Sequence, residues 1–189
     1  MNNKTVKITR IRTCDPAFDE SLALMHASFI DDELRPDDAL RTNTDSSNIF
    51  SFNIIEDEKG CRVGLMTTWN FGKIIYIEHF AIEKGRRGQG YGSASIDKLA
   101  ELSKQPVIIE VEMPETSAEA ASRVKFYERL GFTAWQTPYV QPPYSKGKNA
   151  VPMMLMSKGM EETLECAGIV TALLHRHVYG IKKGAHKAD

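Results

Sequence analysis

Residues 87–92 read Arg87-Gly88-Gln89-Gly90-Tyr91-Gly92, and this glycine-rich turn decides how the surrounding chain is interpreted. An apolar segment, Ile74 to Ile82, precedes the turn, and a segment with helical spacing, Ser93 to Lys104, follows it. The first N–H groups of a helix have no intrahelical partner and lie at the positive end of the helix dipole. Because glycines let the backbone close around an anion, the turn predicts a phosphate-binding site.

Two other phosphate-binding motifs fit the turn poorly, and one interpretation without a ligand remains open from these residues alone. A P-loop ends in Gly-Lys-Ser/Thr, whereas Gly92 is followed directly by Ser93. Compared with a dinucleotide-binding fingerprint, the turn lacks the third glycine at the required spacing. Glu110 and Glu112 do lie about twenty residues further on, where a ribose-binding acid would sit. A basic turn without a ligand is the third interpretation.

The apolar patterns on both sides of the turn predict a mixed α/β sheet. We expect strands at residues 6–11, 49–56, 62–69, 74–82, 107–112, 132–135 and 153–156, and helices from Asp15-Pro16, at 93–104 and at 117–130. Short joints between the second, third and fourth strands predict an antiparallel meander. Residues 136–152 are expected to form a loop, and the last helix is amphipathic, with Ile169, Val170, Leu174 and His177 on its buried face.

Composition narrows the class of protein. Lys and Arg total 24 against 25 Asp and Glu, so no overall field favours nucleic acid or a membrane surface. The three scattered cysteines, Cys14, Cys61 and Cys166, have no metal-ligand spacing and suit free thiols in a reducing compartment. The sequence shows neither a signal-peptide core nor an apolar run of membrane-spanning length. We therefore expect a cytoplasmic protein without a metal, a nucleic-acid partner or a membrane partner.

Two motifs resemble the GNAT superfamily of N-acetyltransferases. Arg87-x-x-Gly90-x-Gly92 resembles the family's Gln/Arg-x-x-Gly-x-Gly/Ala signature, and the run from Phe126 through Tyr127 to Phe132 resembles its second motif. The resemblance implies a GNAT-type, mostly antiparallel sheet of about seven strands flanked by helices, in a domain of residues 1–157. Residues 158–189 are then a C-terminal helical extension and basic tail, packed on the same domain or on a second subunit of a homodimer.

The same resemblance implies acetyl-CoA as the co-substrate. In the family, backbone amides of the turn bind the pyrophosphate, and the fourth strand separates from the fifth and pairs with the pantetheine arm. These roles fall on two sets of residues, Arg87, Gly88, Gln89, Gly90, Tyr91, Gly92 and Ser93 in the turn, and Phe80, Ala81 and Ile82 on the strand. Arg123 stands where family members often carry a small residue, so this arginine is expected to touch phosphate or solvent.

Acetyl transfer to an amine requires two proton movements. The amine must lose a proton to become a nucleophile, and the departing thiolate benefits from receiving one. Tyr127 is the expected general acid, because its phenol is a donor and the resemblance places the family's acid there; a core aromatic role is the alternative. For the general base, Glu78 and Glu112 rank slightly ahead of Glu110, and all three remain open to a solvated role.

We therefore predict an N-acetyltransferase that moves the acetyl group of acetyl-CoA to a primary amine by direct attack in a ternary complex. The acceptor is a small molecule or a peptide, and the resemblance places its site at residues 31–47 and 136–149. The first segment is acidic enough to attract a cationic amine, although solvated loops are often acidic too. Two alternatives remain, a non-catalytic coenzyme A-binding regulatory module and, less favoured, a dinucleotide-binding oxidoreductase.

Overall fold

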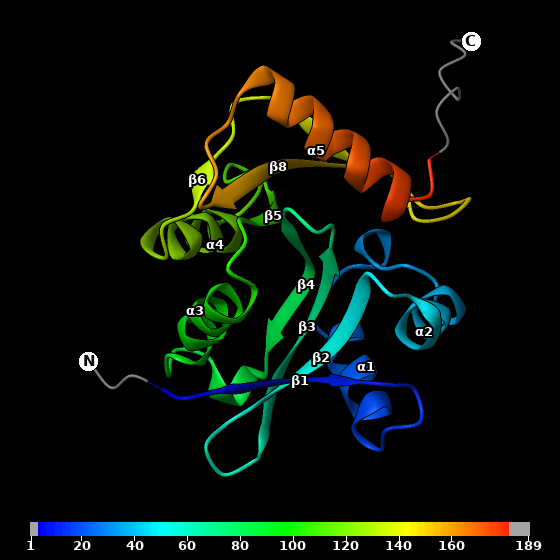
Figure 1. Cartoon of the computed structure of the whole chain (residues 1–189), viewed down its shortest axis with the longest axis vertical. Helices are drawn as coiled ribbons and strands as arrows, with labels where there is room; N and C mark the ends of the chain where they lie inside the picture. The colour runs from blue at the N-terminus through cyan, green and yellow to red at the C-terminus, as the bar shows by residue number, and fades with distance from the viewer. Residues whose placement is uncertain (1–3, 182–189) are drawn as a thin grey trace.

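An eight-stranded sheet runs through the computed structural model, which describes residues 4–181 (Figure 1). The strands are β1 (Lys7–Ile11), β2 (Phe50–Glu56), β3 (Arg62–Asn70), β4 (Ile75–Ile82), β5 (Val107–Glu112), β6 (Thr133–Ala134), β7 (Tyr139–Gln141) and β8 (Val151–Lys158). Their order is β1-β2-β3-β4-β5-β8-β6, with β7 paired to β8, and the β4–β5 pair is parallel whereas the others are antiparallel. The predicted mixed, mostly antiparallel α/β sheet is confirmed.

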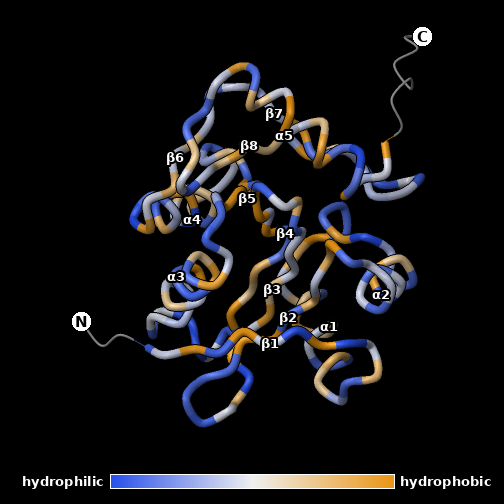
Figure 2. Tube along the Cα trace, in the orientation of Figure 1, coloured by the Kyte–Doolittle hydropathy of each residue, from blue (hydrophilic) through white to orange (hydrophobic). Residues whose placement is uncertain are grey.

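Helices cover both faces of this sheet. They are α1 (Ala17–His26), α2 (Asp37–Ser46), α3 (Tyr91–Ser103), α4 (Ala118–Arg129) and α5 (Leu164–His177), with short 3-10 turns η1 (Asp31–Glu33) and η2 (Lys84–Arg86). Apolar side chains of α1, α2 and α5 share one buried cluster, and those of α3 and α4 share another. Figure 2 shows the apolar strands between these helices and polar connections outside them. No helix within residues 4–181 is both long and apolar enough to cross a membrane.

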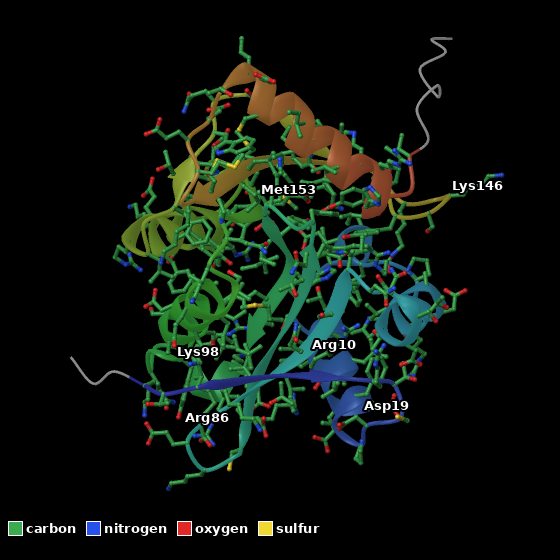
Figure 3. All side chains as sticks on the ribbon, in the orientation of Figure 1. Arg10, Asp19, Arg86, Lys98, Lys146 and Met153 are labelled. Carbon is green, nitrogen blue, oxygen red and sulfur yellow. The ribbon has the colours of Figure 1, made fainter. Side chains whose placement is uncertain are left out.

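Side-chain burial follows this layering. In Figure 3, Asp19 and Lys146 lie at the periphery, and both are exposed, whereas Met153 lies in the interior and is 6% exposed. Met153 sits at the start of β8, beside the region where the sheet opens. The buried interior of the protein therefore extends to the place where β5 and β8 adjoin the N-terminal half of the sheet.

The segment predicted as a loop at 136–152 contains a strand that the sequence did not reveal. β7 pairs with β8 at Tyr139↔Met153 and Gln141↔Val151, and β8 extends beyond the predicted 153–156 at both ends. Prolines at positions 138 and 142 flank β7, so a strand of three residues has no room for a recognisable alternation. Its pairing depends on β8, which is a tertiary contact and leaves no local pattern.

Helix α5 packs on the same core as the rest of the chain. Ala167, Val170 and Leu174 belong to the cluster that contains α1 and α2. Two residues expected on the buried face lie outside it, since Ile169 is 54% exposed and His177 is also exposed. A domain boundary after residue 157 stays a prediction, and the basic tail from residue 182 onward lies outside the described residues.

The sheet opens into a wedge between β4 and β5. These strands pair only at Ile75–Ile77 with Val107–Ile109. Beyond this point β4 continues to Ile82, paired with β3, and β5 continues to Glu112, paired with β8. The β3–β4 register shifts between Thr67 and Thr68, which makes Glu78 the extra residue of a β-bulge on β4. The bulge lies at the position where the two parallel strands begin to diverge.

Candidate active site

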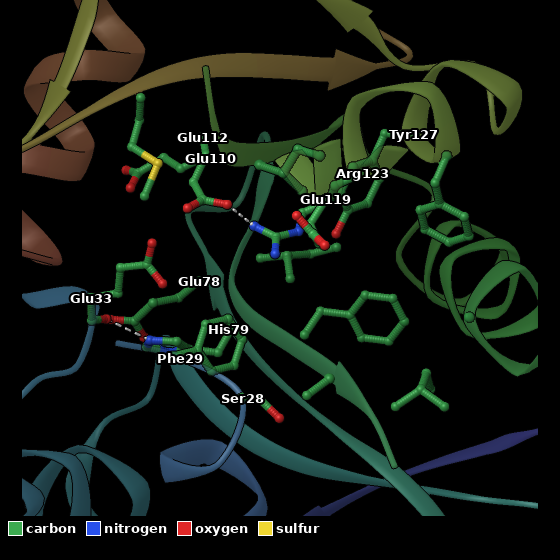
Figure 4. A pocket seen from close by; sticks show the side chains of 18 of the residues that line it. Ser28, Phe29, Glu33, Glu78, His79, Glu110, Glu112, Glu119, Arg123 and Tyr127 are labelled. Atoms are coloured by element: carbon green, nitrogen blue, oxygen red, sulfur yellow. Dashed lines mark hydrogen bonds and ion pairs between the residues drawn. The ribbon is translucent and has the colours of Figure 1, made fainter. Parts of the chain in front are cut away.

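A cavity of about 530 Å³ occupies the wedge between β4 and β5 (Figure 4). One end is formed by the glycine-rich turn, at Arg87, Gly88 and Gly92. The wall then follows β4 from Ile77 to Ile82, and the far end includes Glu110 of β5. Segments from both halves of the chain therefore contribute to a single site.

The glycine-rich turn has the backbone shape that an anion site requires. Gly88 and Gly90 have φ angles of 73° and 91°, in the left-handed region that glycine tolerates best. Gly90 is the N-cap of α3, which begins earlier than predicted, at Tyr91. A Cβ added to Gly92 would lie 3.2 Å from the Phe126 ring, so a side chain here would crowd the cavity wall. The helix start and these glycines fit a bound diphosphate.

The predicted turn residues divide between two surfaces. Arg87, Gly88 and Gly92 line the cavity, and the Arg87 Nε also donates a hydrogen bond of 2.9 Å to the Ile82 carbonyl. Gln89 and Tyr91 line a second, separate hollow. Gly90 and Ser93 line neither. Only part of the predicted set of turn residues therefore lines the cavity.

Strand β4 offers an unpaired backbone edge to the cavity. Phe80, Ala81 and Ile82 all line it, and no described strand pairs with β4 on that side beyond Ile77. Glu78 as a whole is partly exposed while its side chain is 0% exposed, so the part open to the cavity is its backbone. An extended ligand with its own donors and acceptors can occupy such an edge as an added strand would.

The side chain of Glu78 points away into a buried ion pair. Arg35 approaches within 2.5 Å, and the two side chains are 8% and 0% exposed. The indole of Trp69 donates to the same carboxylate at 3.0 Å and the phenol of Tyr144 at 2.9 Å. Burial alone would raise the pKa of Glu78, but Arg35, His79 and the Trp69 indole outweigh it, and the pKa is lowered. Glu78 is therefore a fixed negative charge that already has partners.

Glu110 has the opposite character. The phenols of Tyr139 and Tyr179 donate to its two oxygens at 2.5 and 2.7 Å. Burial raises the pKa of Glu110 to about 7, and the hydrogen bonds from Tyr139, Tyr179 and Tyr76 offset only part of that effect. A cavity-lining carboxyl group with this pKa exchanges a proton near neutral pH.

Tyr127 and Glu112 also reach the cavity, from α4 and the end of β5. Burial raises the pKa of Tyr127 to about 12, so its phenol keeps its proton at neutral pH. Glu112 forms an ion pair of 2.5 Å with Arg123, whose side chain, expected at phosphate or solvent, is 45% exposed. The three carboxylates considered as bases therefore differ in environment: Glu78 and Glu112 face arginines, whereas burial among phenols raises the pKa of Glu110.

Sequence reasoning missed Arg35 and Tyr179 as parts of the site. Arg35 precedes a proline in the connection after α1, and its guanidinium also donates to the Val178 carbonyl at 3.1 Å. Tyr179 follows the last helix and contacts Glu110. Each lies in a segment without periodic signal, and their contacts span 143 and 69 residues of sequence, so no local pattern could have revealed them.

Comparisons with known proteins agree with this geometry. The family model described as acetyltransferase (GNAT) family matches residues 16–132. A GNAT-family structure from Bacteroides thetaiotaomicron is 36% identical, with a TM-score of 0.88, and the match covers 93% of this chain and 99% of that one. A spermidine N-acetyltransferase from Vibrio cholerae, solved with CoA and spermine, is 15% identical, with a TM-score of 0.58 over 81% of this chain and 94% of that one, and shows the fold alone.

A shorter match comes from Bacillus subtilis (strain 168). The protein YjbC, which is named as an acetyltransferase, is 35% identical over 63 residues. This match spans 33% of the present chain and 32% of that protein.

Proposed function

This chain belongs to the GNAT family of acetyltransferases, and we propose that it moves the acetyl group of acetyl-CoA to a primary amine bound in the wedge between β4 and β5. The observation that carries the proposal is the unpaired β4 edge, from Glu78 to Ile82, which leads directly from the glycine-rich turn into the cavity. A phosphate-bearing end and an extended, amide-containing arm are the two features of coenzyme A that this surface matches.

Two groups of residues hold the co-substrate in this proposal. Gly88, Gly92 and the first amides of α3 receive the diphosphate, with the guanidinium of Arg87 nearby. The backbone of Phe80, Ala81 and Ile82 pairs with the pantetheine arm. Acetyl-CoA, when bound, supplies a thioester carbonyl, and the lone pair of the amine forms the new C–N bond as the C–S bond breaks.

Tyr127 is the proposed general acid. Its phenol lines the cavity from α4, and its raised pKa keeps the proton on the phenol at neutral pH. As the C–S bond breaks and negative charge develops on sulfur, the phenol donates a hydrogen bond to the departing sulfur and supplies the proton that makes it a free thiol.

Glu110 is the proposed proton acceptor, in place of Glu78 and Glu112, which the sequence ranked ahead of it. The lowered pKa of Glu78 and its partner Arg35 make it a weak proton acceptor, and Glu112 is occupied by Arg123. Glu110 accepts a proton from the amine directly or through water, since a pKa near 7 matches the pH at which the exchange takes place.

Calorimetric titration with CoA, together with release of free thiol from acetyl-CoA in the presence of amines, tests this proposal. Gly92→Val places methyl groups against the Phe126 ring and into the cavity, and we expect CoA binding to weaken at least about tenfold, in line with the cost of overpacking. Gly85→Val is the matched control, because a Cβ at Gly85 meets nothing within 4 Å and its φ is not positive.

Equal CoA affinity in the two variants would contradict the assigned cofactor surface. CoA binding without thiol release for any amine would favour the regulatory-module alternative over an enzyme.

A further inference from the structure

The two ends of the cavity differ in charge. Arg87 lies at the turn, whereas Glu33, Glu110 and Glu112 line the wall around the far end (Figure 4). The Glu78 carboxylate does not add to this charge, because Arg35 neutralises it. Arg123 likewise balances Glu112. Within residues 4–181, neither Glu33 nor Glu110 forms an ion pair, and although Arg123 also acts on Glu33, the acidic side chains outnumber the cations at this end.

Glu33 is held in place by contacts that do not use its carboxylate. The imidazole Nε2 of His79 lies 2.9 Å from the Glu33 carbonyl, and the Glu33 N–H donates to the Ile30 carbonyl at 3.0 Å. The ammonium group of Lys148 donates to the next carbonyl, that of Leu34, at 2.7 Å. The backbone is thus fixed on both sides of Glu33, and its side chain is presented to the cavity (Figure 4).

The other acidic residues of this segment are already engaged. Asp31 accepts from Lys148 at 3.1 Å, and Asp32 accepts from the backbone and side chain of Asn149 at 2.9 and 3.0 Å. Their partners lie in the connection between β7 and β8, so these contacts join the two loops that enclose the far end. Glu33 lines the cavity, whereas neither Asp31 nor Asp32 does.

A half-buried carboxylate without an ion-pair partner gains free energy when a cation binds beside it. Burial raises the pKa of Glu33 and the nearby charge of Glu112 raises it further, while Arg123 and the Ile30 backbone offset only part of that rise. Apolar and aromatic groups, Phe29, Tyr144 and Met153, line the same cavity and suit a hydrocarbon chain. A negatively charged site lined by carbon groups matches an alkyl chain that ends in an ammonium group.

We propose that the acceptor carries a second positive charge, as in an aliphatic diamine, with its reacting nitrogen beside Glu110 and its second ammonium group paired with Glu33. This inference rests on the proposed function and narrows its substrate class. Glu33 is then a specificity residue, which selects diamines over monoamines of equal length and rejects amines that carry a carboxylate. The bond changes at the thioester are the same as for any amine.

The test compares diamines from 1,3-diaminopropane to 1,8-diaminooctane with the monoamine and the amino acid of the same chain length. Thiol release from acetyl-CoA gives kcat/KM, and calorimetry on the CoA-saturated protein gives the affinity for each amine. For the best chain length we expect kcat/KM to favour the diamine at least about tenfold, as for the gain or loss of one enclosed charge pair. The amino acid is expected to be the poorest of the three.

Glu33→Gln should remove most of this preference, by raising KM for the diamine while leaving the monoamine within about twofold. Glu115→Gln is the matched control, since Glu115 is an exposed acid before α4 that does not line the cavity. Monoamines that match diamines at every length, or a preference that survives Glu33→Gln, would overturn the inference and leave acetyl transfer intact. If no amine releases thiol, the proposed function fails, and the calorimetric comparison of Glu33→Gln with the unaltered protein still decides whether Glu33 binds the second charge.

Discussion

Removing the positive charge of Arg35 is the sharpest test of how the site is held together. Arg35→Met keeps an unbranched chain of similar reach and leaves the 0% exposed side chain of Glu78 without its cation. Two hydrogen bonds to Glu78 remain, from Trp69 and Tyr144, but neither brings a charge. Breaking a buried pair by removing one partner typically costs 3–5 kcal/mol, so we expect a loss of about 3–5 kcal/mol in the free energy of unfolding at pH 7.5.

The pH dependence of that loss follows from Glu78. In the unaltered protein the pKa of Glu78 lies below its ordinary value of 4.5. At pH values above 4.5 this difference stabilises the fold, and the contribution disappears as the pH falls. Without Arg35, burial dominates and raises the pKa of Glu78, which reverses the sign. The variant is therefore most destabilised at high pH and recovers as the pH falls and Glu78 takes up a proton.

Urea unfolding followed by circular dichroism, at pH 7.5 and pH 5, measures both effects. Adding Glu78→Gln to Arg35→Met should restore at least about 2 kcal/mol, because the uncompensated charge is then gone. Arg41→Met is the matched control, since Arg41 and Asp19 form an exposed ion pair of 2.8 Å whose loss should cost less than about 1 kcal/mol. If Arg35→Met costs no more than Arg41→Met, or if the second substitution restores nothing, the reasoning is refuted.

Three further predictions concern the cavity and the strand behind it. Tyr127→Phe should lower kcat at least about a hundredfold while CoA affinity stays within a factor of about two, and unchanged turnover would remove Tyr127 from the mechanism. The pH profile of kcat/KM should rise through an apparent pKa near 7 as Glu110 ionises, and Glu110→Gln should abolish that rise; a rise that persists in the variant would assign it to another group. Gly64→Ala should destabilise the protein by about 1–3 kcal/mol in urea unfolding, because the new Cβ would collide with the Ala81 carbonyl oxygen. Gly60→Ala is the comparison variant, since its Cβ meets open space and adds only the strain of a positive φ of 75°.

The sequence predicted the parts of the fold that depend on local pattern. Strands with strong apolar character appear at their expected places, and so does α4, which Ser117 caps by accepting from the Ala120 N–H, whereas α3 begins earlier than expected, at Tyr91. The glycine-rich turn was also recognisable, because its function requires residues without side chains, here at alternating positions. The strand that was not expected, β7, depends on pairing with β8 and has no pattern of its own.

The charged interior could not be predicted in the same way. Glu78 and Glu110 look alike in sequence, as glutamates within apolar strands. Burial raises the pKa of both, but Glu78 meets the charge of Arg35, which outweighs burial, whereas Glu110 meets the neutral phenols of Tyr139 and Tyr179, which offset only part of it. A carboxylate's partners, more than its own strand, decide whether it can accept a proton, and those partners were brought together only by the tertiary fold.

The distance in sequence between Arg35 and Val178 has a consequence for the order in which the chain acquires its shape. During synthesis the first half of the protein, including Glu78 and Arg35, leaves the ribosome long before the carbonyl that Arg35 contacts 143 residues later. Until then, the guanidinium lacks one acceptor and Glu110 lacks the phenol of Tyr179. A nascent chain therefore carries an unfinished wall around its future site until the segment that follows α5 has docked.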